Sequence, residues 1–340
     1  MNIPMKKFLC MFSLLAFCAL WVSAQDCETS EGGEATVRIY RTSVPLLPGE
    51  FSVSATHKVR FARGNLRYRA SDNSWDIDDT QYENLETEGG NSTTIAAGRA
   101  TQSEWIDLFG ACTSGWSGSG AVAYQPWAVS TTNSDYGPPV GYNATGEYEY
   151  CDWGKSFYAG FRLMTAAEWQ YLIRERANWR SLRAAGQLFG KNGVFLLPDG
   201  WDWEHLPDAL GSARTAYNSA IEAYNASHDP DRQSFAWNPN TSAANGYQPY
   251  TSHIIYDITE GHTFWDKLQE AGVVFLPSCG WRNGTTINYD RGLHYYTSTS
   301  YGSGWYIFHY REGSGTGFSV PLGVSQRYYG RSVRLVKDVE

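Results

Sequence analysis

Apolar and polar residues alternate in the stretch FSVSATHKVRFARGNLRYRA, residues 51–70. This period of two is typical of half-buried β-strands and predicts a hairpin near the start of the folded region. Two later runs resemble each other, GVFLLPDGW at residues 193–201 and GVVFLPSCGW at residues 272–281, and both end in Pro and Gly. We interpret them as two central strands of one sheet.

Helical patterns are short. At three places a threonine stands three residues before an acidic residue, with a tryptophan next to the acid: Thr101 with Glu104, Thr165 with Glu168, and Thr263 with Asp266. This is the spacing of a capping box, in which the two side chains bind backbone N–H groups at the helix start. It predicts three helix starts. Gly110 and Gly272 predict where the first and third helices end.

A fourth helix is predicted from Pro207 to about Ser227. Its apolar residues fall on one face at helical spacing: Leu210, Ala213, Tyr217, Ile221 and Tyr224. A polar stretch rich in Asn, Asp and Pro follows it. We therefore expect an insertion at about residues 205–250 within one domain that spans residues 49–340.

The first 24 residues have the pattern of an export signal. Lys6 and Lys7 precede an apolar run that closes on Val22-Ser23-Ala24, a small-residue cleavage site. The run is shorter than the about 20 apolar residues of a membrane-spanning helix. We expect cleavage after Ala24, an extracellular, periplasmic or outer-membrane-surface location, and a tether over residues 25–48. Whether a lipid anchor is used is left open.

Aromatic residues are the unusual feature of the composition. The 340 residues include 14 Trp, 23 Tyr and 15 Phe, and only 18% are charged, which excludes a disordered chain. The net charge of −8 gives no sign of the basic stripe of a nucleic-acid-binding protein. Five tryptophans near predicted helix starts and strand ends are assigned to the core: Trp105, Trp169, Trp201, Trp265 and Trp281.

Export would leave four cysteines, Cys27, Cys112, Cys151 and Cys279. They permit three disulfide pairings that the sequence does not distinguish, and free buried cysteines or one bridge are the expected states. No Cys or His spacing typical of a zinc site occurs. We expect no metal and no cofactor.

Several strings resemble the formylglycine-generating-enzyme superfamily, which has a C-type-lectin-like fold. GFRLMTAAEWQYLIRERA (residues 160–177) is similar to a sequence motif of that superfamily. Four others recur in its secreted branch, the major paralogous domain proteins of Bacteroidota and Fibrobacter: GVVFLPSCGWRNGT, HYYTSTS, WYIFHY and YYGRSVRLVKD. The resemblance covers roughly residues 50–338. It implies an α+β, C-type-lectin-like single domain.

The enzymes of that superfamily use a copper-binding cysteine pair near the C-terminus or an iron site of histidines. This chain has no cysteine between Gly292 and Glu340, and its seven histidines show no H-x-x-x-H spacing. The resemblance therefore implies the scaffold, and we assign no catalytic residue.

The C-terminal stretch YDRGLHYYTSTSYGSGWYIFHY, residues 289–310, is rich in Tyr, Ser, Gly and Thr. Such a composition is typical of antibody binding loops, and the resemblance places a ligand surface in the same region. We predict exposed ligand-binding rings at Tyr301 and Trp305. Four further ligand-binding candidates are Tyr295 and Tyr296, expected to be half buried, and Tyr328 and Tyr329. The alternate residues Tyr306, Phe308 and Tyr310 are assigned to the core.

Other charged residues receive structural interpretations. Asp72, Asp76, Asp78 and Asp79 offer oxygens of the kind that Ca²⁺ binds, but without EF-hand spacing, and we interpret the stretch as a solvated turn. Glu168 is assigned to its helix cap. Buried ion pairs are expected for three arginines in the family motifs: Arg162, Arg331 and Arg334.

These features favour an exported, non-catalytic recognition module that binds a glycan or a surface protein. Two alternatives stay open. One is a diverged enzyme of the superfamily, a metal-dependent oxidase or a hydrolase. The other is a structural surface protein whose rings all serve packing.

Overall fold

The fold is taken from a computed structural model of the chain. It describes residues 38–39, 44–72, 74–83, 85, 104–111, 129–133, 136, 152–154, 158, 160–228, 253–288, 292–301, 304–311, 318–319 and 324–340. Cys27, Cys112 and Cys151 lie outside these residues. Cys279 is described, and it is free and buried.

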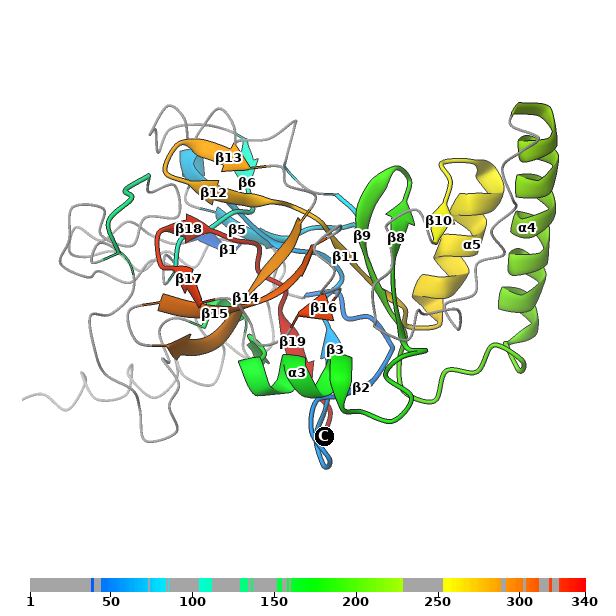
Figure 1. The fold of residues 1–340 in the computed structure, drawn as a ribbon, viewed down its shortest axis with the longest axis horizontal. Coiled ribbons are helices and arrows are strands. Elements are labelled where there is room, and N and C mark those ends of the chain that lie inside the picture. Colours follow the sequence, from blue (N-terminus) through cyan, green and yellow to red (C-terminus); the bar gives the residue numbers. More distant parts are fainter. Residues whose placement is uncertain are drawn as a thin grey trace, which may run out of the picture.

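The described part is an α+β fold of small sheets with few helices. Figure 1 shows α4 and α5 side by side at one end of the molecule, and β12, β13 and β18 at the other end. None of the helices described is both long and apolar enough to cross a membrane.

The first and last described parts of the domain meet in one sheet. Its order is β2-β3-β19-β7, with strands at Phe51–Ser52, Lys58–Phe61, Val336–Asp338 and Phe161–Arg162. β2 and β3 form the predicted hairpin. Val336 lies opposite Phe61, and both are buried in the core. The last part of the predicted hairpin leaves this sheet and forms β4 in another.

The two similar runs lie in one sheet, as predicted, but only one of them is central in it, so the prediction of two central strands is wrong for the other. β9 (Lys191–Leu196) and β11 (Val274–Pro277) pair antiparallel in a sheet of order β10-β8-β9-β11. The other strands are β8 (Arg183–Leu188) and β10 (Ile254–Ile255). β9 is central in this sheet and β11 is an edge strand.

Two helices pack beside this sheet. α4 (Asp208–His228) begins one residue after Pro207 and matches the predicted helix closely. Its apolar stripe is buried from Leu210 to Ile221, whereas Tyr224 is exposed. α5 (Thr259–Glu270) ends before Gly272, whose positive φ of 90° suits the predicted end. The remainder of the predicted insertion, residues 229–250, is outside the described residues.

The capping signals have three different outcomes. In α3 (Ala166–Arg174) both halves of the box are present, because the Thr165 hydroxyl accepts from the Glu168 N–H and the Glu168 carboxylate accepts from the Thr165 N–H. The start predicted at Thr263 is wrong by about one turn: its hydroxyl lies inside α5 and donates to the Thr259 carbonyl. α5 has no side-chain cap of its own at Ile258.

The helix predicted from Thr101 to Gly110 is wrong where the structure describes it, from residue 104. Trp105 and Ile106 form β6, which pairs with β4, and Phe109 bridges to Arg331. Strand partners far along the chain thus override the local capping signal. Thr101 itself lies outside the described residues.

The middle of the acidic stretch has ionic partners, so its interpretation as a solvated turn is wrong for Asp76 and Asp78, whereas Asp79 is exposed in a bend. Asp76 lies in a sheet of order β1-β5-β4-β6, with β1 at Arg38–Ile39, β5 at Ser74–Ile77 and β4 at Leu66–Arg69. A 3-10 turn, Ala70–Asp72, joins β4 to β5. Arg67 lies opposite Asp76 and donates to it at 2.6 Å, and also donates to Asp78 at 3.2 Å. Both aspartates are buried.

Two of the five tryptophans assigned to the core are buried in it. Trp169 and Trp265 are buried as expected, and Trp169 stacks on Phe308 at a ring distance of 4.4 Å. Trp105, Trp201 and Trp281 are only half buried, so their assignment to the core is wrong. Trp201 nevertheless packs against the core, and Trp105 packs against the guanidinium groups of Arg67 and Arg69.

Candidate ligand-binding site

A three-stranded sheet carries the half-buried aromatic residues near the C-terminus. Its order is β13-β12-β18, with strands at Thr286–Asn288, Trp281–Asn283 and Tyr329–Gly330. Trp281 pairs with Asn288, and Asn283 lies between Thr286 and Tyr329. Because directly opposed residues share a face, Trp281, Asn283 and Tyr329 lie on the same side of this sheet.

The two faces of this sheet differ in burial. Arg282, Ile287 and Gly330 share the inner face, and the Arg282 side chain is completely buried. On the outer face Trp281, Asn283, Asn288 and Tyr329 are all half buried. We call Trp281, Asn283, Tyr328, Tyr329 and Arg331 the aromatic face.

The rings of the aromatic face are close together. The centroids of Trp281 and Tyr329 are 4.6 Å apart with an angle of 50° between the rings. The buried Arg331 guanidinium lies 5.0 Å from the Trp281 centroid and 5.4 Å from that of Tyr329. A cation at this distance from two aromatic rings is attracted to both, so Arg331 stabilises the Trp281–Tyr329 pair.

Gly330 allows the strand that carries Tyr329 to lie close to its neighbour. A Cβ at this position would come within 2.8 Å of the Arg282 Cβ and Nε atoms. That distance is too short for any side chain, so glycine is required by the close approach of β18 to β12.

Tyr328 extends the aromatic face at the turn before β18. Its ring meets that of Tyr329 edge to face at 4.8 Å. Desolvation and a side-chain hydrogen bond with Tyr329 raise the pKa of the Tyr328 phenol. It is therefore neutral at physiological pH and presents a hydroxyl group.

A polar rim adjoins the aromatic face. The Asn133 amide donates to the Gln326 side chain and its oxygen accepts from the Arg327 N–H at 2.8 Å. Thr131 lies beneath the β12–β13 turn, where its Cγ2 is 3.0 Å from the position of a Cβ on Gly284. Residues 129–133 therefore connect the two turns that flank the outer face; Gln326 is exposed and Asn133 is half buried.

The six predicted ligand-binding residues divide into three pairs. Tyr328 and Tyr329 are half buried and lie on the aromatic face. Tyr295 and Tyr296 are 0% and 1% exposed, so the expectation of half-burial is wrong and neither ring is part of an exposed surface. Burial is enforced by the core on both sides, since Tyr296 stacks on Trp153 and Tyr295 belongs to the cluster around Trp169.

The hydroxyl groups of both buried tyrosines form hydrogen bonds with neighbouring groups. The Tyr295 hydroxyl donates to Asn65 Oδ1 at 3.0 Å, and the same oxygen accepts from Arg334 Nε at 2.9 Å. The Tyr296 hydroxyl donates to the Tyr329 carbonyl at 2.7 Å. Burial raises the pKa of both phenols.

Tyr301 and Trp305 are described by their backbone alone. They lie at the tip of a hairpin between β14 (Gly292–Tyr301) and β15 (Gly304–Arg311), where Tyr301 opposes Gly304 and Ser300 opposes Trp305. β15 also pairs with β16 (Phe318–Ser319) and β17 (Val324–Gln326). Their side chains are outside what is described, so their exposure stays a prediction. The same holds for Tyr306 and Tyr310, whereas Phe308 is buried as predicted.

The sequence interpretation missed Trp281, Asn283 and Arg331 as site residues. The alternation Trp281-Arg282-Asn283 is the signal that could have found them, because period two separates Trp281 from the buried Arg282. Of the arginines expected in ion pairs, Arg162 pairs with Glu168 and Asp338, both at 2.7 Å. Arg334 is instead held by Asn65 and by backbone carbonyl groups.

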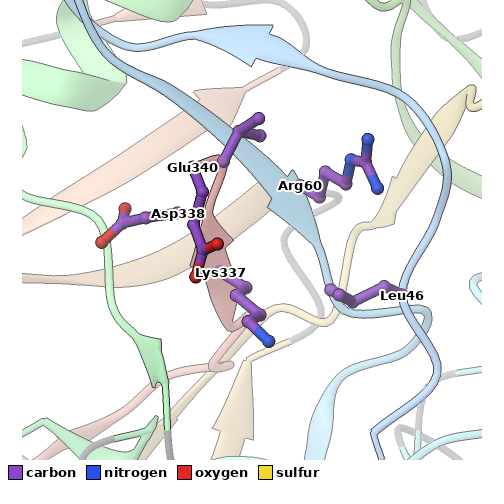
Figure 2. Close-up of a pocket in the computed structure, with 6 residues that line it drawn as sticks. Leu46, Arg60, Lys337, Asp338 and Glu340 are labelled. Atoms are coloured by element: carbon purple, nitrogen blue, oxygen red, sulfur yellow. The ribbon is translucent and has the colours of Figure 1, made fainter.

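The structure also has a polar hollow of about 270 Å³ beside β3 and β19. Figure 2 shows Arg60 and Lys337 on one side of β19 and Asp338 pointing away from them. Arg60 donates to Glu50 at 2.8 Å, and Asp338 accepts from Arg162 and His57. Since Arg60 and Asp338 already have partners within the protein, the hollow is a weaker ligand-site candidate than the aromatic face.

Groups of three or more His, Cys, Asp or Glu side chains arranged to hold a metal are absent from the described residues. No family model, curated protein or solved structure matches the chain.

Proposed function

We propose that the protein is a non-catalytic recognition module that binds a glycan through the aromatic face. The observation that carries this is the Trp281–Tyr329 pair, two half-buried rings 4.6 Å apart on one face of a sheet. Arg331 contacts both rings, Gly330 lets β18 lie close to β12, and the Tyr296 hydroxyl binds the Tyr329 carbonyl. Together these contacts fix the position of the two rings at the surface. The C–H groups of a sugar ring pack on such faces, while Trp N–H and Tyr O–H groups bind its hydroxyls.

Polar groups around the rings suit a hydroxyl-rich ligand. The Asn283 side-chain oxygen has no hydrogen-bond partner among the described residues. A buried acceptor without a partner costs about 1–3 kcal/mol, so a ligand hydroxyl that reaches it gains the corresponding amount. Asn288 adds an amide group on the same face, and an amide can both donate and accept.

The proposal includes the finer fold and the location predicted from the sequence. We propose a C-type-lectin-like domain, supported by the sequence resemblance and by the pairing of β19 with β3 across the domain. We also propose export to the cell surface, periplasm or medium, supported by residues 1–24.

A glycan array with the labelled protein tests the proposal. We expect a restricted set of neutral glycans to bind, and Trp281→Ala with Tyr329→Ala to abolish that binding. The matched control is Trp179→Ala, which removes a half-buried tryptophan held by two arginines elsewhere on the surface. Binding that needs neither ring, or a ligand that is a protein instead of a glycan, would overturn it.

A further inference from the structure

A second cluster of rings, of which Trp201 is half buried and Trp203 is buried, lies at the opposite end of the molecule. The loop from β9 to α4 carries Trp201 and Trp203, whose ring centroids are 5.1 Å apart. The Arg214 guanidinium, from the second turn of α4, lies 5.0 Å from the Trp203 centroid. Figure 1 places α4 far from β12, β13 and β18, so this cluster is separate from the aromatic face.

Arg214 has no acidic partner in the described part of the chain. Its guanidinium makes no ion pair there, and its Nε atom is buried without a hydrogen-bond partner. Burial is the cause of a lowered pKa of Arg214, with no acidic group acting against it. Arg176 is buried more deeply, but it has an acidic partner, Asp199, at 3.1 Å. A partly buried arginine normally binds an anion, because leaving its charge unpaired is costly.

Two more polar atoms beside Arg214 have no partner. Asn218 lies one turn further along α4 on the same helix face, and its side-chain oxygen is buried and without a partner among the described residues. Trp201 Nε1, a hydrogen-bond donor, is likewise buried and without a partner among the described residues. A buried polar group without a partner costs free energy, and three of them lie in this one region, where a ligand with matching groups would satisfy them.

We propose that Trp201, Trp203, Arg214 and Asn218 bind an acidic sugar, a uronic acid residue of a polysaccharide. The planar guanidinium matches a carboxylate and can hold it with two parallel hydrogen bonds. Asn218 accepts a hydrogen bond from a sugar hydroxyl and Trp201 donates one. The half-buried Trp201 ring offers a face to the pyranose. The net charge of −8 works against long-range attraction, so binding depends on these short-range contacts.

Calorimetric titration with trigalacturonate tests this site, with the fully methyl-esterified trisaccharide as the neutral probe. We expect trigalacturonate to bind the full chain at least about tenfold more tightly than the ester, since a charged hydrogen bond contributes about 1.5–3 kcal/mol. Equal affinity for both probes, or binding of neither, overturns the proposal.

Variants identify the residues. Arg214→Gln should reduce trigalacturonate affinity at least about tenfold, and Asn218→Asp should weaken it by adding a carboxylate that repels the ligand.

The matched control is Arg180→Gln, because Arg180 is exposed and lies 4.6 Å from the Trp179 ring. It should bind like the wild type. If Arg180→Gln and Arg214→Gln weaken binding equally, or if Asn218→Asp has no effect, the site is refuted. The result does not depend on the aromatic face, because Trp281→Ala should leave it unchanged.

Discussion

The hydroxyl of Tyr296 donates a hydrogen bond to the backbone carbonyl of Tyr329 at 2.7 Å. Tyr296 is buried against Trp153, and Tyr329 lies on the surface beside Trp281. A buried ring thus supports the strand whose half-buried ring we assign to the ligand. The proposed site is therefore connected directly to the core.

Tyr296→Phe should weaken both stability and ligand binding. The substitution keeps the ring but leaves the Tyr329 carbonyl without this donor, which costs about 1–3 kcal/mol. Because β18 loses a support, we also expect affinity for the glycan to fall. Denaturant unfolding and a fluorescence titration measure the two effects.

Tyr295→Phe is the control for that variant. Tyr295 is the preceding residue and is equally buried, but its hydroxyl donates to Asn65 and Pro277 and not to β18. It should lose a similar amount of stability and keep wild-type affinity. If both variants change affinity equally, Tyr296 has no specific role at the site.

Glycine-to-alanine substitutions should have opposite effects at two positions. At Gly330 the added methyl would meet Arg282 at 2.8 Å, and we expect a loss of about 1–3 kcal/mol. At Gly211, inside α4, no atom lies within 4 Å of the added Cβ, and alanine should stabilise the protein by about 0.5–1 kcal/mol. Equal changes in the free energy of unfolding would contradict the close approach of β18 to β12.

Stability should fall in acid partly through Asp338. Partial burial favours its neutral form, but hydrogen bonds from Arg162 and His57 outweigh this and keep the pKa of Asp338 below its ordinary value. A lowered carboxyl pKa contributes stability above the unfolded pKa of about 3.9, and this is lost as pH falls through the folded value. The effect is under about 1 kcal/mol, because solvent screens a half-exposed pair.

The Asp338→Asn variant isolates this effect. Its free energy of unfolding should decline less than that of the wild type between pH 5 and pH 3, as measured by urea unfolding. Parallel curves for the two proteins would show that Asp338 carries no stabilising charge.

A chelator should leave the protein unchanged. The buried acids Asp76 and Asp78 already bind Arg67, so they do not need a cation. We expect the same unfolding temperature and glycan affinity with and without EDTA. Stoichiometric calcium, copper or iron in protein purified without chelators would favour the diverged-enzyme alternative.

Local patterns predicted the fold well where local interactions decide it. The capping box at Thr165 and the stripe of α4 depend on neighbours within one or two turns, and both are present. The similar runs pair because each is apolar throughout and needs a buried sheet. The helix predicted at Thr101 failed because β6 is determined by its pairing with Tyr68 and Arg69, far away in the sequence.

The site could be predicted only in part for the same reason. Composition pointed to residues 289–310, which contain Tyr295 and Tyr296 but not Tyr328 and Tyr329, and nothing local separated the buried pair from the half-buried one. That separation comes from long-range packing against Trp153 and Asn65. Trp281 and Arg331 join the site through the register of β12 with β18, which no local pattern contains.

A titration of wild type, Trp281→Ala and Trp179→Ala with one glycan identified on the array tests the aromatic face directly. We expect Trp281→Ala to lose about 2 kcal/mol or more of binding free energy, the scale of an aromatic hot spot. Trp179→Ala should match the wild type within error. Equal affinity for all three proteins would contradict the assignment of the aromatic face as the binding site.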